Sequence, residues 1–380
     1  MVLRPLPLLD ANASVPPVPE ARAAVAAALD DAAGANPSSP HAAGRRARRL
    51  LDRARDACAH MLAASSKEVF FTSGATEGNR FVVDALVEAA TAAGRPWHVV
   101  TSPVEHPSVH KPLRRAHARG QLVVTSLPVD DGVVATSGPQ VASLLAGADA
   151  VVVTAAHNET GLVLDLEALL ALCPTQAVVA VDAAQSMARR GPPPGRADIV
   201  VASGHKLGGV AGAGALVLRG RARSLPLPWV AGGQEQGVRP GTENVVGIAA
   251  LGAAADVIAR TRARHVALGP LRDRLEAAVV AAGVRAIGAG LDRLENTSAF
   301  LVPGVDAEAL RLSLDQAGVA VGFGAACSAL APEPSPSLQA LGLDGADARR
   351  VVRVSLAPGL DAADVDDAAA RIVEVIRRLR

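Results

Sequence analysis

An acidic residue and a lysine follow two neighbouring apolar runs in the middle of the chain, and this pair suggests the clearest chemistry. The runs 177–181 and 199–202 are short and apolar, as buried parallel strands are. Asp182 follows the first run and Lys206 the second, where a doubly wound sheet places its ligands. Pyridoxal phosphate needs such a pair, an amine for its aldehyde and a carboxylate that keeps its ring nitrogen protonated. Alone, the stretch also fits a capped helix and an ordinary loop.

A phosphate-binding turn is expected near residue 74. A strand is predicted at 68–71 and a helix from there to about residue 93, with small residues between them. Backbone N–H groups at such a helix start can bind an anion, and Ala75 and Thr76 are the candidate donors. An ordinary capped helix start is the alternative.

Three further polar residues lie where side chains could reach a ligand. His106 follows the strand expected at 97–101 and could stack on a planar cofactor and move protons; a surface histidine is the plainer alternative. Asn158 follows the strand expected at 150–154. Asn12 is either a turn residue or an amide that reaches a substrate.

The elements that must position these residues alternate between strand and helix, which indicates an α/β fold. Ser39 is expected to cap a first helix that has Pro40 at its first position. A polar, Gly-rich loop over 232–244 suggests a site or a subunit contact. The pattern then changes to a smaller α+β unit. Its expected strands are 297–302, 319–323 and 351–355, and its expected helices are 307–317 and 362–379.

Composition restricts the class of protein. Half of the 380 residues are hydrophobic, a fifth are charged and the net charge is +1, which argues against disorder and a polyanion-binding surface. The arginines over 45–55 form a solvated helix face more readily than a nucleic-acid patch. Three distant cysteines form no metal-ligand or disulfide pattern. With no signal core and no apolar region long enough to span a bilayer, a cytoplasmic protein is expected.

Cys327 lies in a segment with glycines before it and prolines after it, which favours a loop or a strand end. A thiol there is expected to be partly exposed, and the alternative is an inert small residue. Reactivity requires a lowered pKa or a nearby base, because the thiolate is the nucleophile.

Ten short segments, taken together and in order, resemble the cysteine desulfurases. They span residues 9–356 and read LDANAS, NPSSPH, FTSGATE, SPVEHPSV, HNETG, VDAAQS, SGHKLGG, GGQEQGVRPGT, GAACS with EPS, and VRVSL. The resemblance implies the aspartate-aminotransferase-like fold (PLP fold type I), with a mostly parallel seven-stranded sheet in a large domain over 16–259. A smaller α+β domain would comprise 1–15 and 260–380 and would carry Cys327 and Arg353.

The resemblance also implies a role for each candidate residue. The catalytic residues would be Lys206, which would bind the cofactor covalently, His106, and Cys327, which would accept sulfur from L-cysteine as a persulfide and leave L-alanine. The cofactor would be held by Ala75, Thr76, His106, Asp182, Gln185, Ser203, His205 and Lys206, joined by Thr242 from the other subunit of a homodimer. The substrate carboxylate would be held by Asn158 and Arg353, with Asn12 nearby.

The segments are most similar to the branch that serves iron–sulfur cluster assembly. Three departures, Arg80, Ala11 and the run 323–325, also resemble the specialised desulfurase of bacterial DNA phosphorothioation. Arg80 and Ala11 would touch the surroundings of the site. A sulfur-acceptor protein is the expected partner. The Cys327 thiol is expected to rest away from the cofactor, because a strand precedes it closely and prolines follow it. The alternatives are a selenocysteine lyase or related lyase or aminotransferase, and a non-catalytic protein that docks sulfur-acceptor partners.

Overall fold

A seven-stranded sheet forms the centre of the molecule in the computed structural model, which describes residues 8–32, 34–324 and 333–380. The strand order is β1-β9-β8-β7-β6-β2-β3, and β9 alone runs antiparallel to its neighbours. The strands are β1 (Val69–Thr72), β2 (Trp97–Thr101), β3 (Leu122–Ser126), β6 (Ala150–Thr154), β7 (Val178–Asp182), β8 (Ile199–Ser203) and β9 (Gly214–Leu218). The predicted α/β fold with a mostly parallel seven-stranded sheet is confirmed.

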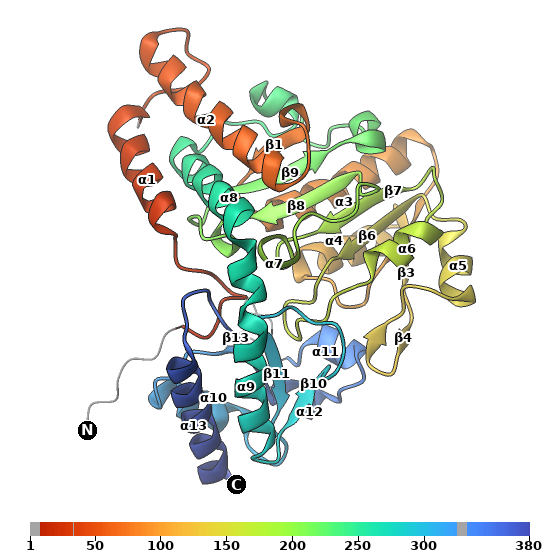
Figure 1. Cartoon of the computed structure of the whole chain (residues 1–380). Helices are drawn as coiled ribbons and strands as arrows, with labels where there is room; N and C mark the ends of the chain where they lie inside the picture. Colours follow the sequence, from red (N-terminus) through yellow and green to blue (C-terminus); the bar gives the residue numbers. More distant parts are fainter. Residues whose placement is uncertain (1–7, 33, 325–332) are drawn as a thin grey trace.

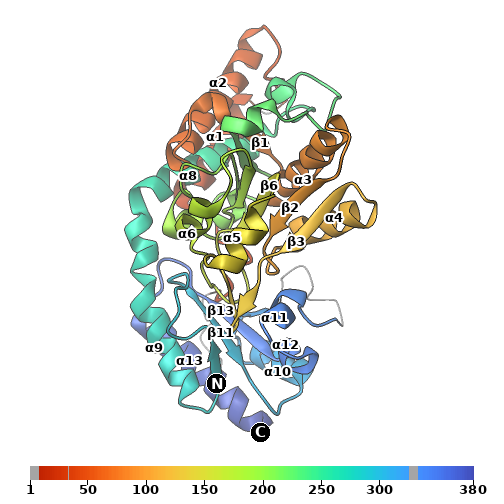
Figure 2. The same ribbon diagram turned by 90° about the vertical axis from the view of Figure 1, so that its right-hand side faces the viewer.

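Helices cover both faces of this sheet, so that the molecule is layered (Figures 1 and 2). Every residue of β6, β7, β8 and β9 is buried, as expected for strands enclosed on both faces. Side chains of α3 (Ala75–Ala92) and α4 (Pro107–Ala118) pack on one face. The other face carries α2 (Ala42–Met61), α5 (Pro139–Leu145), α6 (Leu166–Leu172), α7 (Met187–Arg190) and α8 (Val245–Val266). Helix α1 (Pro19–Ala32) packs against α8 and α2.

A second, antiparallel sheet of four strands has its own core below the first (Figure 1). Its order is β10 (Arg285–Ile287), β11 (Thr297–Leu301), β13 (Val351–Ser355) and β12 (Gly322–Phe323). Its helices are α9 (Leu268–Val280), α10 (Ala307–Gln316), α11 (Pro336–Ala340), α12 (Gly345–Arg349) and α13 (Ala362–Leu379). Leu9 belongs to this core, and its N–H donates to the Ala320 carbonyl oxygen.

The remaining elements are short connections. They are the two-stranded ribbon β4 (Val129–Asp130) and β5 (Val133–Val134), and the 3-10 turns η1 (Ser66–Glu68), η2 (Gly204–Lys206), η3 (Gly220–Ser224) and η4 (Gln234–Gly237). No helix in the described ranges is both long and apolar enough to cross a membrane.

Two predicted boundaries were wrong. The helix predicted to begin at Pro40 does not have Ser39 as its cap. Ser39 lies in a turn, and its backbone N–H donates to the Asn36 carbonyl. His41 caps α2 instead, accepting the Gly44 N–H at its Nδ1 over 3.2 Å. The strand expected at 319–323 is reduced to β12, because the Val319 N–H closes the end of α10.

Helices α2 and α8 approach closely at Gly252. A Cβ atom there would lie 2.5 Å from the Cα of Ala54, and both helix backbones would have to separate to admit it. Gly269, in α9, is a helical glycine with room: the nearest atom to its added Cβ is 4.0 Å away. The α2–α8 contact therefore depends on glycine at position 252.

Gly252→Ala is expected to destabilise the protein by about 1–3 kcal/mol, since overpacking outweighs the higher helix propensity of alanine. The measurement is the urea or thermal unfolding midpoint, with Gly269→Ala as the matched control, whose midpoint should be unchanged or higher. An unfolding midpoint for Gly252→Ala at or above that of the wild type would show that the helices have room to adjust.

Candidate active site

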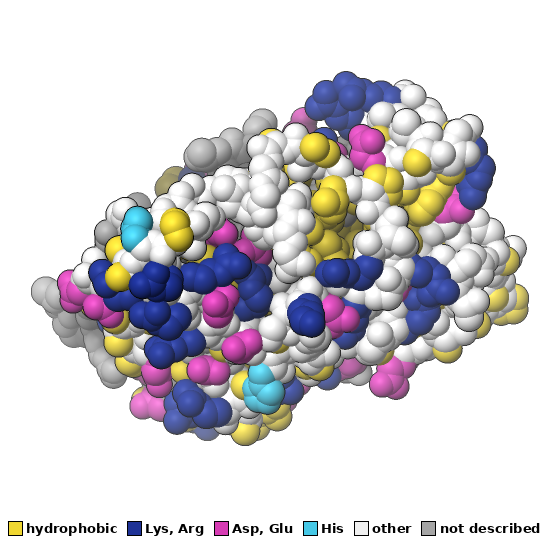
Figure 3. All heavy atoms as spheres, turned by 90° about the horizontal axis from the view of Figure 1, so that it is seen from above, with side chains coloured by type: hydrophobic (Ala, Val, Ile, Leu, Met, Phe, Trp, Pro, Cys, Tyr) yellow, Lys and Arg dark blue, Asp and Glu magenta, His cyan; other side chains and the backbone are white. Residues whose placement is uncertain are grey.

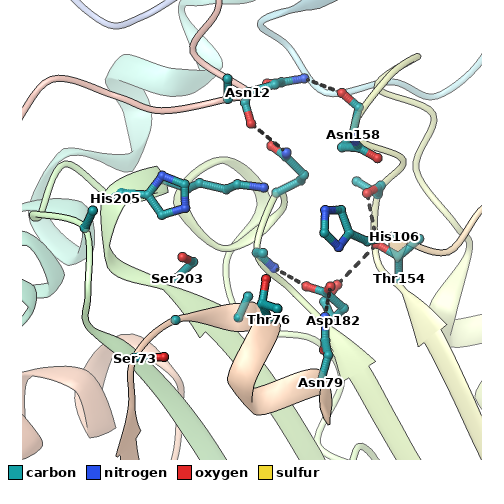
Figure 4. A pocket seen from close by; sticks show the side chains of 18 of the residues that line it. Asn12, Ser73, Thr76, Asn79, His106, Thr154, Asn158, Asp182, Ser203 and His205 are labelled. Atoms are coloured by element: carbon teal, nitrogen blue, oxygen red, sulfur yellow. Dashed lines mark hydrogen bonds between the residues drawn. The ribbon is translucent and has the colours of Figure 1, made fainter. Parts of the chain in front are cut away.

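A cavity of about 280 Å³ opens at the carboxyl ends of the parallel strands. Figure 4 shows the labelled side chains, among them Asn12, His106 and Asp182, arranged around one space. Of the residues predicted for the site, those that line it are Asn12, Ala75, Thr76, His106, Asn158, Asp182, Gln185, Ser203, His205, Lys206 and Arg353. These residues come from seven separate parts of the sequence, and the fold brings them together.

Two predicted site residues are not part of this group. Thr242 is exposed and does not line the cavity of its own chain, so its predicted contact with a neighbouring subunit stays a prediction. Cys327 lies within 325–332, outside the described residues. The predicted resting position of its thiol therefore stays a prediction.

Lys206 is the one lysine at the cavity. The whole chain has three lysines; Lys67 lies in η1 and Lys111 in α4, and neither lines the cavity. Lys206 ends the turn η2, which follows β8 directly and is held by the bond from the Gly204 N–H to the Ala213 carbonyl. Any lysine chemistry in this cavity therefore belongs to Lys206.

Asp182 is the last residue of β7 and keeps 8% of its surface exposed at the cavity. Its Oδ1 accepts the Ala184 N–H over 2.9 Å, and its Oδ2 accepts a hydrogen from Nδ2 of Asn79 over 2.7 Å. Each of these oxygens has a second lone pair. The carboxylate can thus also accept from a protonated ring nitrogen.

Asn79 was missed by the sequence analysis. It follows Ala75 by four residues in α3, and this spacing places it on the same helix face as the predicted phosphate donors. That spacing was the available signal. Arg80, the departure expected to touch the surroundings of the site, pairs instead with Asp84 over 2.6 Å at the surface.

His106 is held as one tautomer. Its Nδ1 lies 3.1 Å from the Ser108 backbone N and 2.7 Å from the Ser108 Oγ, which accepts in turn from Asn79. Because a backbone N–H can only donate, Nδ1 accepts, and the neutral ring carries its proton on Nε2. Burial lowers the pKa of His106, while the Asp182 charge acts in the opposite direction. The ring is therefore mostly neutral at pH 7.

The start of α3 fits a phosphate. Gly74 is the N-cap residue and provides no side-chain cap, so the first N–H groups of this 18-residue helix are available to an anion. Close packing requires small residues here, since a Cβ at Gly214 would lie 2.6 Å from the Gly74 Cα. These N–H groups suit a phosphate, the amine of Lys206 suits an aldehyde, and the carboxylate of Asp182 suits a protonated ring nitrogen. Together the three fit pyridoxal phosphate.

Arg353 lies at the opposite side of the cavity, with only 1% of its surface exposed. Its Nη2 pairs with the Asp10 carboxylate over 2.5 Å, and its Nη1 donates to the Asn158 carbonyl over 3.1 Å. Its buried Nε has no hydrogen-bond partner within the described part of the chain. An orphaned guanidinium N–H at a cavity suits the carboxylate of a ligand.

Asn12 is used within the protein. Its Nδ2 donates to the Asn158 carbonyl over 3.1 Å and to the Thr297 Oγ1 over 3.0 Å, so both amide hydrogens are engaged. Its backbone carbonyl accepts from Nε2 of Gln185 over 2.9 Å. Asn12 thus links the N-terminal segment to both sides of the cavity.

Glu105 is buried beside the site. Its Oε1 accepts the Ser102 hydroxyl over 2.5 Å and the Thr154 N–H over 2.8 Å, which ties the loop before His106 to β6. Its Oε2 is buried with no partner among the described residues. Burial raises the pKa of Glu105 from 4.5 to about 8, so the side chain is largely protonated at neutral pH.

Comparison with known proteins gives one consistent result. Residues 8–367 match the family model described as aminotransferase class-V. A cysteine desulfurase of Cereibacter sphaeroides is 36% identical, over 97% of this chain and 94% of its own length. A solved NifS-like protein superimposes with a TM-score of 0.88 at 26% identity, over 98% of this chain and all of its own. The crystal structure of DndA from Streptomyces lividans superimposes with a TM-score of 0.76 at 31% identity, over 90% of this chain and 97% of its own.

The raised pKa of Glu105 predicts a pH-dependent contribution to stability. The unfolded carboxyl loses its proton near 4.5, whereas the folded one keeps it to about 8, so stability falls as pH rises through this window. In the wild type this group lowers the free energy of unfolding by up to about 1.4 kcal/mol per pH unit, and Glu105→Gln should abolish that dependence. The measurement is the urea midpoint from pH 5 to 8.5, with the exposed Glu88→Gln as control. Parallel profiles for Glu105→Gln and wild type would contradict the raised pKa.

Proposed function

The chain belongs to the aminotransferase class-V family and, within it, to the cysteine desulfurases, and from this premise we propose the reaction that its site performs. The protein binds pyridoxal phosphate and converts L-cysteine to L-alanine, with the sulfur held as a persulfide on Cys327 for transfer to an acceptor protein. The observation that carries the proposal is the meeting of Lys206, Asp182 and the uncapped start of α3 in one cavity.

Four groups of this chain would hold the cofactor: Lys206 at its aldehyde, Asp182 at its ring nitrogen, and Ser203 and the α3 N-terminus at its phosphate. When bound, the cofactor supplies an electron sink that weakens the bonds at the substrate Cα. Lys206 is the base for the Cα proton; it must be neutral to act, and a neighbouring cationic ring in a poorly hydrated cavity favours that form. The Arg353 guanidinium binds the substrate carboxylate. His106 moves protons through Nε2, the nitrogen that carries the ring proton because Nδ1 accepts from Ser108.

Cys327 is the proposed sulfur acceptor. Its thiolate forms an S–S bond with the substrate sulfur while the carbon–sulfur bond breaks, and the carbon takes up a proton to become alanine. The two other cysteines are buried, and burial raises the pKa of Cys58 to about 12 and of Cys173 to about 11. Since the thiolate is the nucleophile, neither can compete at neutral pH.

The proposed assembly has two domains per chain and two chains. Residues 16–259 form the cofactor-binding domain, and residues 1–15 with 260–380 form the small domain; the packing of Leu9 in the second core supports this division. In a homodimer, Thr242 of one chain completes the phosphate site of the other. The loop that carries Thr242 is anchored by Glu235, which pairs with Arg55 over 2.7 Å.

Other functions are separable by experiment. A selenocysteine lyase or an aminotransferase on the same scaffold would turn over its substrate without Cys327. A docking protein without catalysis would release no alanine from cysteine. Nucleic-acid binding has little support, because basic and acidic side chains are interspersed on the face seen in Figure 3, and Arg48 pairs with Asp52. Retention on a DNA column that decreases steeply with salt concentration would be needed to support nucleic-acid binding.

Lys206→Ala and Cys327→Ser are expected to fail in different ways. Lys206→Ala should lose the visible absorbance of the bound cofactor, whereas Cys327→Ser should keep it and lose sulfur transfer. The measurements are the absorbance spectrum and the release of alanine and of sulfide with a reductant, with Cys173→Ser as control. Normal turnover by Cys327→Ser with a persulfide acceptor would rule out the sulfur relay.

Gly322→Ala is expected to weaken substrate binding. A Cβ at Gly322 would lie 2.5 Å from Nη2 of Arg353, whose guanidinium is fixed by Asp10 and Asn158 and would have to move. KM for cysteine should rise roughly tenfold, equivalent to about 1.4 kcal/mol, with kcat less affected. Gly195→Ala, with open space around its added Cβ, is the control. An unchanged KM would show that Arg353 does not hold the substrate.

A further inference from the structure

Arg189 is a buried cation whose hydrogen bonds serve one neighbour. It lies in α7 with 2% of its surface exposed. Its Nη1 donates to the backbone carbonyl of Gln185 over 2.6 Å and to the Gln185 Oε1 over 3.2 Å. Within the described ranges it has no carboxylate at ion-pair distance, and its Nε has no partner. Burying a cation without a carboxylate partner costs free energy, so the buried guanidinium is expected to serve a function.

These contacts determine which way the Gln185 amide points. A guanidinium can only donate, so the amide oxygen must face Arg189. The backbone carbonyl of Asn12 can only accept, so Nε2, 2.9 Å away, must face Asn12. The two partners therefore fix the orientation independently of how the amide atoms are assigned.

The fixed orientation leaves one N–H for the cavity. Nε2 has two hydrogens, and the Asn12 carbonyl accepts one of them. Gln185 lines the cavity that Asp182 and Lys206 also line. The second hydrogen is therefore available to a ligand atom that accepts, such as the ring oxygen of pyridoxal phosphate.

We propose that Arg189 is a positioning residue that fixes the Gln185 carboxamide with an N–H directed at the ring oxygen of the cofactor. This inference rests on the proposed function. An N–H at that oxygen favours its negative charge and loosens the proton that the oxygen shares with the nitrogen of Lys206. Donation by Arg189 to the amide oxygen also polarises the amide and strengthens its N–H as a donor.

A merely structural role for Arg189 makes a different prediction. Its bond to the Gln185 backbone carbonyl also ties the side chain of Arg189 in α7 to the residue before the N-cap, and losing that bond would lower stability without moving the titration of a bound ligand. Arg190 is the matched control. It is the next residue, carries the same charge, and pairs at the surface with Asp292 over 2.7 Å and Glu295 over 2.9 Å, away from Gln185.

The test is a double-mutant cycle read in the absorbance of the cofactor-loaded protein. The pH midpoint of the visible absorption change is measured for wild type, Gln185→Leu, Arg189→Met and the double variant, with Arg190→Met as control. Gln185→Leu should raise the midpoint by about one pH unit, the worth of a hydrogen bond to a charged group. Arg189→Met should raise it by less and add nothing in the Gln185→Leu background, because Arg189 acts through Gln185.

The outcomes separate the two proposals. A colourless wild type would overturn the proposed function. A coloured wild type with an unchanged midpoint in Arg189→Met, or with additive shifts in the double variant, would overturn the role of Arg189 alone. If Arg189→Met does not hold the cofactor, Arg189→Lys replaces it; retained donation to the amide oxygen should keep the midpoint near that of wild type. Loss of the cofactor in Arg189→Lys as well, with Gln185→Leu still coloured, would also overturn the role.

Discussion

The hydrogen-bonded register between β7 and β8 is the constraint on which the site depends. Asp182 lies opposite Val201 in this parallel pair, and Lys206 follows β8 in the turn η2. Neighbouring strands are about 4.8 Å apart, so a carboxylate and an amine at their carboxyl ends reach the same cavity. A slip of one residue would turn Asp182 to the other face of the sheet. The apolar cores on both faces, which bury every residue of these strands, prevent that slip.

Burial gives the polar groups around the cavity their chemical character. It lowers the pKa values of His106 and His205 and raises that of Glu105, so these side chains are largely neutral at pH 7. The charges that remain are held by partners, as Arg353 is by Asp10. In such a poorly hydrated space each hydrogen bond is stronger than in water, and each unpaired group is more costly. The proposed binding of a substrate carboxylate by Arg353 would give its orphaned Nε a partner.

Much of the site could be predicted from the sequence, because its residues directly follow apolar strands. Asp182, Lys206, His106 and Asn158 were identified in this way, and the sheet topology brings them together.

The contacts that orient them could not be predicted, since no local pattern encodes a contact across the fold; helical spacing indicated only which face of α3 carries Asn79. Asn79 and Asp182 are 103 residues apart, and Asp10 and Arg353 are 343 apart. Arg189 and Arg190 are adjacent arginines in the sequence, and only tertiary packing makes the first buried and the second exposed. The start of α2 was placed two residues early because a turn at Ser39 competes with capping.

The central claim is that Lys206 binds the cofactor beside Asp182, and the small number of lysines makes it directly testable. The purified protein, loaded with pyridoxal phosphate, is reduced with borohydride, digested and mapped by mass spectrometry. The account predicts one modified peptide, which contains Lys206 and carries the mass of the reduced cofactor. Modification of Lys67 or Lys111 instead, or of no lysine in a protein that stays colourless, would contradict it.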